Sequence, residues 1–209
     1  MRVLAIDTAL EACSAAVLDT NSGIAASETL AMTRGHAEAV TPLIARVMSA
    51  AAIEFVDLDR IAVTTGPGSF TGLRVGISAA RGIALATGKP AVGLSTLAGF
   101  AAPLIADDDN TQVVAAIDAR HEQVYLQVFG SGGRTVVAPR LASVRDAARA
   151  AMTGPARIVG SAAIVRFRWV GESEAVADGK KSSTNLHILM NWQKQGADWK
   201  LLSRASTKL

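Results

Sequence analysis

A glycine-rich turn between an apolar run and a helical segment constrains the fold of this 209-residue chain more than any other feature. The run Leu58–Thr64 predicts a buried strand, Gly66–Gly72 forms the turn, and Leu73–Ala86 predicts a helix of small residues. Three glycines and a proline in seven residues let the backbone approach another group closely. The turn has neither a Walker A ending nor GxGxxG spacing, so a ligand loop and a ligand-free packing turn are equal alternatives.

Strands and helices alternate around this turn. Apolar residues at three- and four-residue spacing predict a helix from His36, and its regular part is expected to start at Pro42. The order of the elements predicts an α/β domain with a mixed sheet. Further strands are predicted at 3–6, 14–18, 24–30, 91–94, 112–118 and 123–130, and further helices at 96–102 and 143–152.

The small residues of the predicted helix after the turn have a regular spacing. Gly72, Gly76 and Ala80 are four residues apart, which places them on one helix face. That face lets another backbone approach closely. The spacing does not say whether this backbone belongs to the same chain or to a partner.

Few residues carry a recognisable chemistry. Asp7-Thr8 ends the first predicted strand, where it could face a phosphate or magnesium or only start a turn. Arg74 could pair with an anion or with an acidic residue of the same fold. Cys13 lies in an apolar run and is predicted to be a buried thiol. A convincing catalytic set is not recognisable from these residues.

A metal site on the helix from His36 is not predicted. Two helical histidine ligands need a spacing of four residues, but position 40 is Val40. We therefore expect His36 to be a surface or capping residue.

Composition divides the chain near residue 163. Residues 1–163 hold 13 Lys and Arg against 14 Asp and Glu, whereas residues 164–209 hold 8 against 4 and all three tryptophans. Because the basic excess belongs to the last segment, it is weak support for nucleic-acid binding by the main body. The single cysteine, the early Asp7 and the lack of a long apolar run predict a cytoplasmic protein with no membrane segment.

Three blocks in a fixed order resemble the TsaB (YeaZ) family over about residues 1–161. They are Leu4–Thr8, Gly66–Gly76 and Ile117–Arg120, the last leading to Val124-Tyr125. The resemblance implies an actin/Hsp70/sugar-kinase-like (ASKHA) α/β fold of two lobes with mixed sheets. Residues 1–100 would form the first lobe, 101–163 part of the second, and 164–209 an atypical β-rich tail.

The resemblance also implies a function. The chain would be a non-catalytic scaffold of the complex that puts threonylcarbamoyl on the adenosine beside the anticodon of ANN-decoding tRNAs. Its partners would be a TsaD-type catalytic subunit and a TsaE-type ATPase, with a homodimer when alone and tRNA contacted only through the complex. ATP and metal are implied in those partners and none in this chain.

Residue roles follow from the same resemblance. Asp7, Thr8, Gly66 and Gly68 would be a vestigial nucleotide or phosphate loop. The partner interface would use the two first-lobe helices, with the core of the same lobe as an equal alternative for each residue. The interface residues would be His36, Val40, Leu43, Ile44 and Val47, with Gly72, Leu73, Val75, Gly76, Ala79 and Ala80.

The last segment does not fit that family. Residues 164–170, 186–192 and 199–204 alternate or return as strands, with a turn at Gly196-Ala197-Asp198. Residues 191–207 are similar to the final hairpin of SnoaL/NTF2-like proteins. Two other functions stay open, an ATPase or glycoprotease-like peptidase and an NTF2-like small-molecule binder, although 46 residues are few for the latter.

Overall fold

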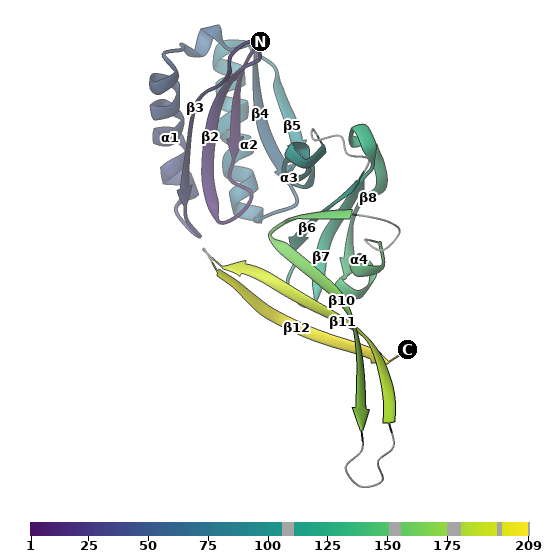
Figure 1. Cartoon of the computed structure of the whole chain (residues 1–209). Helices are drawn as coiled ribbons and strands as arrows, with labels where there is room; N and C mark the ends of the chain where they lie inside the picture. Colours follow the sequence, from purple (N-terminus) through teal and green to yellow (C-terminus); the bar gives the residue numbers. More distant parts are fainter. Residues whose placement is uncertain (106–110, 151–155, 175–180, 196–197, 209) are drawn as a thin grey trace. The chain divides into compact units, whose positions relative to one another are not determined.

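The computed structural model describes residues 1–105, 111–150, 156–174, 181–195 and 198–208, and from Ala162 onward it describes the backbone alone. The chain divides into two compact units, Met1–Gly99 and Phe100–Leu209. Figure 1 shows a mixed sheet with helices in the first unit and strands for most of the second.

The first unit is built on a five-stranded sheet of order β3-β2-β1-β4-β5. The first three strands form an antiparallel meander, and β4 and β5 continue from β1 in parallel. All five strands were predicted from their apolar runs, and each is confirmed within a few residues. The strands are β1 (Arg2–Asp7), β2 (Ala12–Asp19), β3 (Gly23–Ala31), β4 (Arg60–Gly66) and β5 (Ala91–Ser95).

Two long helices pack on this sheet, α1 against β2 and β3 and α2 against β4 and β1 (Figure 1). Their apolar faces meet the alternate residues of the strands, such as Leu4 and Ile6, and form the core of the unit. The helical segments are α1 (His36–Ala51), the short η1 (Phe55–Asp57), α2 (Phe70–Thr87) and α3 (Thr96–Ile105), which crosses the boundary between the units.

Helix α1 begins earlier than predicted. Its regular part was expected to start at Pro42, but the helix is continuous from His36 and Pro42 lies inside it. The first turn is held by burial of His36 and Val40. This packing outweighs the backbone hydrogen bond that a proline inside a helix cannot make.

The second unit contains a four-stranded sheet of order β8-β7-β6-β9. The predicted strands at 112–118 and 123–130 are confirmed as β6 and β7, while β8 and β9 were not predicted. The predicted helix at 143–152 is shorter, because Ser143 ends β8 and residues 151–155 lie outside the described residues. The elements are β6 (Gln112–Asp118), β7 (Gln123–Phe129), η2 (Ser131–Gly133), β8 (Thr135–Ser143), α4 (Val144–Ala150) and β9 (Ala156–Gly160).

The atypical last segment forms a separate three-stranded antiparallel sheet of order β10-β11-β12. The three strands predicted there are confirmed, each longer than expected, and the predicted turn at 196–197 lies outside the described residues. The helices of the described part include none long and apolar enough to span a membrane. The strands are β10 (Ala162–Glu174), β11 (Lys181–Gln195) and β12 (Asp198–Lys208).

Candidate functional site

The glycine-rich turn packs against the turn that joins β1 to β2. A Cβ atom on Gly68 would overlap the carbonyl oxygen of Ala9, and one on Gly72 would overlap the carbonyl oxygen of Thr8. A Cβ atom on Gly76 would overlap the hydroxyl oxygen of Thr8. The predicted stripe of small residues on α2 therefore admits the backbone of the chain's own first hairpin.

Hydrogen bonds between the two turns use their polar groups. The Ser69 amide donates to the Ala9 carbonyl at 2.6 Å, and the Thr8 hydroxyl donates to the Gly72 carbonyl at 2.7 Å. The Gly72 amide donates to the Ser69 hydroxyl, which caps α2, at 3.3 Å. A phosphate loop needs amides directed at the anion. These amides are bound within the protein, which favours the packing alternative for the turn.

Two other members of the predicted loop, Gly66 and Asp7, have structural roles. Gly66 has a φ of 107°, a left-handed conformation that only glycine adopts easily. Asp7 accepts hydrogen bonds on one carboxylate oxygen from the Ala9 amide at 2.9 Å and from the Thr64 hydroxyl at 2.7 Å. Asp7 thus joins the ends of β1 and β4 and fixes the start of the first turn.

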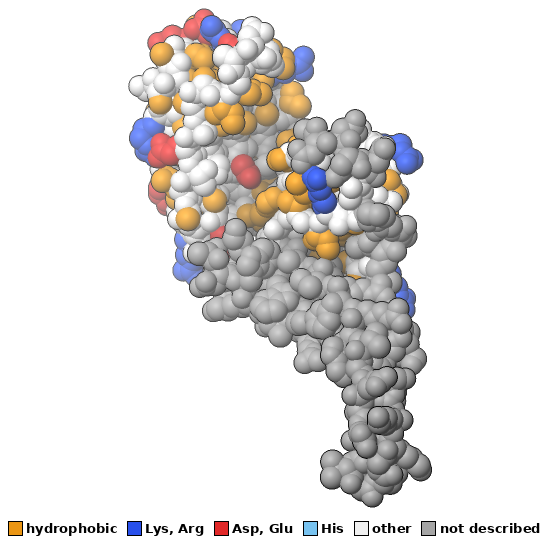
Figure 2. Space-filling view, in the orientation of Figure 1, with side chains coloured by type: hydrophobic (Ala, Val, Ile, Leu, Met, Phe, Trp, Pro, Cys, Tyr) orange, Lys and Arg blue, Asp and Glu red, His pale blue; other side chains and the backbone are white. Residues whose placement is uncertain are grey.

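A hollow of about 260 Å³ lies beside Asp7 and is lined by residues of all five strands of the sheet. Asp7 is the only charged residue among the described residues that line it. Figure 2 shows mostly hydrophobic and uncharged side chains over the strands of this unit. Because no Lys or Arg is among these lining residues, the hollow offers no positively charged side chain to a nucleotide's phosphates.

His36 and Cys13 are both buried in the first unit. His36 was expected to be a surface or capping residue, but it is buried, and a ring nitrogen lies 3.1 Å from the Leu10 carbonyl, a contact that joins α1 to the first hairpin. Cys13 is fully buried as predicted, and burial, followed by the charge of Asp7, raises the pKa of its thiol. Among the described residues, no three His, Cys, Asp or Glu side chains gather as metal ligands.

The residues proposed for a partner interface lie mainly on the inner faces of the two helices. Those of α1 are buried in the core, and Gly72, Gly76 and Ala80 of α2 are buried as well. Leu73, Val75 and Ala79 are half-buried. The buried members therefore fit the core alternative that was kept for each of them, because periodicity gives the apolar face and that face covers the sheet. The buried α1 members are His36, Val40, Leu43, Ile44 and Val47.

The opposite, outer face of α2 carries apolar and small side chains that sequence analysis did not select. Phe70 is 68% exposed and Leu85 is 87% exposed. The guanidinium of Arg74 lies 3.8 Å from the centre of the Phe70 ring. Gly82 has open space where its Cβ would be. We define the outer face of α2 as the exposed residues Phe70, Thr71, Arg74, Ser78, Arg81, Gly82, Leu85 and Ala86.

Comparison with known proteins finds relatives of the TsaD and TsaB proteins. A family model described as TsaD, tRNA N6-adenosine threonylcarbamoyltransferase, matches residues 23–189. The chain is 40% identical over 125 residues to the tRNA threonylcarbamoyladenosine biosynthesis protein TsaB of Escherichia coli (strain K12), covering 60% of this chain and 53% of that protein. It is 32% identical over 211 residues to a tRNA N6-adenosine threonylcarbamoyltransferase of Sorangium cellulosum, covering 85% of this chain and 58% of that protein.

A solved structure of YeaZ from Pseudomonas aeruginosa is similar with a TM-score of 0.59 at 33% identity, covering 68% of this chain and 66% of that chain. This likeness and the strand order of the first unit confirm the predicted α/β, actin/Hsp70/sugar-kinase-like fold class. The chain spans about half the length of the curated TsaB relative that it matches, 53% of the protein from Escherichia coli.

Proposed function

Because the chain belongs to the TsaD domain family and, within it, to the TsaB (YeaZ) type, we propose that it is a non-catalytic scaffold subunit in the synthesis of threonylcarbamoyladenosine on tRNA. It would act by binding a TsaD-type catalytic subunit, with a TsaE-type ATPase joining the assembly. ATP and metal would be held by those partners. The protein would contact tRNA only as part of the complex.

One observation carries the non-catalytic part of this proposal. The turns that could hold a phosphate are bonded to each other, through the Ser69 amide and the Thr8 hydroxyl. The alternative of an ATPase or peptidase would need free polar groups at this place. Hydrolysis of ATP by the purified chain that Asp7→Ala abolishes would support that alternative instead.

The outer face of α2 is the surface that we propose for the TsaD-type partner. Its large apolar side chains, Phe70 and Leu85, are exposed at the two ends of the helix. Ser78, Gly82 and Ala86 lie between and beside them at four-residue spacing and allow a second helix to approach closely. An exposed glycine inside a helix costs about 0.5–1 kcal/mol relative to alanine. Close approach of a partner would be a reason to keep it.

Substitution at Leu85 tests this surface. We expect Leu85→Glu to weaken binding of the TsaD-type subunit about thirtyfold or more, because a charge would replace an apolar anchor of the interface. The matched control is Ile24→Glu, since Ile24 is also exposed, at 68%, but lies on β3 and not on α2. Affinity is measured by titration calorimetry, and circular dichroism checks that both variants are folded.

Equal affinities of Leu85→Glu and the wild-type chain would overturn the interface assignment. Failure of the wild-type chain to bind any TsaD-type subunit would overturn the scaffold function itself. A substitution such as Gly76→Arg is unsuited to this test, because a side chain there would collide with Thr8 and disturb folding.

A further inference from the structure

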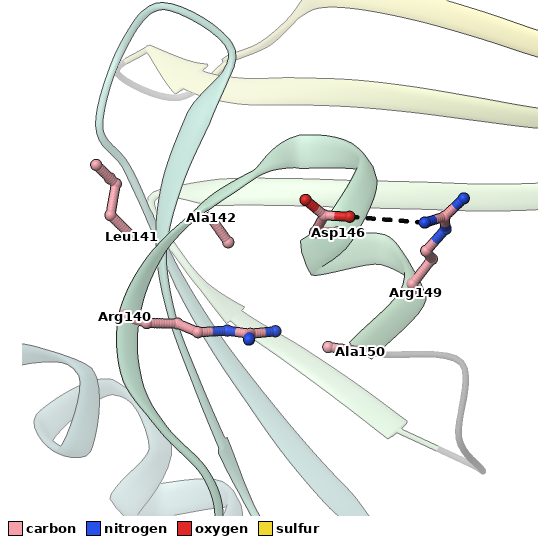
Figure 3. Close-up of a pocket in the computed structure, with 6 residues that line it drawn as sticks. All are labelled: Arg140, Leu141, Ala142, Asp146, Arg149 and Ala150. Carbon is pink, nitrogen blue, oxygen red and sulfur yellow. Dashed lines mark ion pairs between the residues drawn. The ribbon is translucent and has the colours of Figure 1, made fainter.

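A hollow in the second unit is lined by two arginines that take no part in the contacts described above. It has a volume of about 420 Å³ and lies between the end of β8 and helix α4. Figure 3 shows the Arg140 side chain extending from β8 toward the end of α4, where Ala150 lies, and Arg149 projecting from the same helix. The lining residues are Arg140, Leu141, Ala142, Asp146, Arg149 and Ala150.

The one acidic residue of this hollow has another partner. The Ser143 hydroxyl donates a hydrogen bond to the Asp146 carboxylate at 2.8 Å and accepts one from the Asp146 amide at 3.1 Å, so Ser143 caps α4. Asp146 lies 3.8 Å from Arg149, but their side chains are 58% and 70% exposed, so this ion pair is weak. The lining thus holds two guanidinium groups and one carboxylate, so the hollow carries a net positive charge.

Of the two arginines, Arg149 is paired with Asp146, whereas Arg140 has no such partner among the described residues. Within the part of the chain that the structure describes, no ion pair or hydrogen bond engages its side chain. Arginine presents a planar fork of donors that matches two oxygens of a phosphate, whereas lysine acts as a point charge. The remaining lining, Leu141, Ala142 and Ala150, is apolar and offers no side-chain donor or acceptor to read a base.

We infer that Arg140 and Arg149 form a phosphate-binding site that takes a phosphodiester of an RNA backbone. The site has cations for the phosphate and a volume within the range of small-ligand sites, which leaves room for the attached sugar. Apart from the two arginines and Asp146, which is bonded to Ser143, its lining has no side-chain donor or acceptor, so the site would position RNA without reading its sequence. The inference rests on the proposed function, because the complex supplies the tRNA.

The test measures tRNA affinity of the full chain, alone and in the complex with TsaD- and TsaE-type subunits, at several salt concentrations. Each phosphate contact contributes a slope of about 0.7–0.9 to the salt dependence, which is about five- to eightfold in affinity near 0.1 M salt. Arg140→Ala and Arg149→Ala should each weaken binding, and the double alanine variant should lose this factor in full and lower the slope by about 0.7–0.9. Arg145→Ala is the matched control, since Arg145 is an exposed arginine of α4 outside the hollow.

Arg140→Lys keeps the charge but not the fork, so its affinity should fall between those of the wild type and Arg140→Ala. Unchanged affinity and slope in the double alanine variant would overturn the site, and so would an equal loss in Arg145→Ala. ATP binding that the double variant loses, with RNA affinity unchanged, would overturn the RNA assignment in favour of a free nucleotide. If no complex forms, the proposed function fails, whereas a complex whose tRNA affinity is unchanged in the double variant overturns only the site.

Discussion

At the scale of single residues, the glycines of α2 divide into two kinds. Gly76 faces the first hairpin, where a Cβ atom would overlap the Thr8 hydroxyl, while Gly82 faces open space on the outer side. Gly76 therefore permits the packing of the unit. Gly82 contributes nothing to packing within the chain.

The two glycines should respond oppositely to alanine. Gly76→Ala should lower the free energy of unfolding by about 1–3 kcal/mol, because the new methyl group displaces Thr8 and its hydrogen bond. Gly82→Ala should raise it by about 0.5–1 kcal/mol, because alanine restricts the unfolded chain and favours the helix. Denaturant unfolding followed by circular dichroism measures both, and a stabilising Gly76→Ala would contradict the packing assigned to the turn.

The part of the site that could be predicted from sequence is the spacing of the small residues along α2. Gly72, Gly76 and Ala80 at four-residue intervals correctly indicated a close backbone approach on one face of α2. The spacing could not identify the approaching group, since a hairpin of the same chain and a partner helix require the same small residues. Which group approaches is decided by contacts between residues about sixty positions apart in sequence, such as Thr8 and Gly72.

At the scale of elements, prediction succeeded where an apolar run is buried, with alternation in β1 and continuously in β6. β1 and β6 were predicted within one residue, because their apolar side chains cover a core. β8 was not predicted. It is an exposed strand at the edge of its sheet, it contains Pro139, and its burial pattern has no regular alternation. Its partner β7, not its own composition, determines its structure.

An ion pair joins two elements that sequence analysis placed separately. Arg46 of α1 donates hydrogen bonds to both carboxylate oxygens of Glu28 on β3, at 2.7 and 2.9 Å. This bonding lowers the pKa of Glu28 from its usual 4.5. The pair therefore stabilises the folded state above pH 4.5, and this stabilisation is lost as the pH falls through the lowered pKa.

Removing Arg46 should return Glu28 to its ordinary titration. In Arg46→Met we expect the pKa of Glu28 to rise toward 4.5, measured by NMR of the side-chain carboxyl carbon. Arg81→Met is the control, because Arg81 lies on α2 and has no ion pair within the described residues. An unshifted Glu28 pKa in Arg46→Met would show that the pair does not persist in solution.

At the scale of the whole molecule, the break in composition near residue 163 corresponds to a change of architecture. The strands before it belong to two mixed sheets, and those after it form a separate antiparallel sheet. The family model extends to residue 189, beyond the part that carries the recognised motifs. Sequence analysis found the strands of this segment from alternation, but the similarity of residues 191–207 to an NTF2-like hairpin stays a prediction.

The outer face of α2 leads to a prediction about assembly. We propose that the chain alone forms a homodimer through this face, because an exposed apolar surface can bury itself against its own copy in a two-fold arrangement. The same face is proposed for the TsaD-type subunit. The two assemblies should therefore exclude each other.

Light scattering during size exclusion measures this competition. The chain alone should have a mass of about 43 kDa, twice its own 21.6 kDa, and Leu85→Glu should reduce it to the single-chain value. An excess of TsaD-type subunit should replace the homodimer by a complex with one copy of each chain. A complex with two copies of this chain and a bound TsaD-type subunit would place the two contacts on different surfaces. In that case a Leu85→Glu variant that lost only one of them would show which contact the outer face of α2 makes.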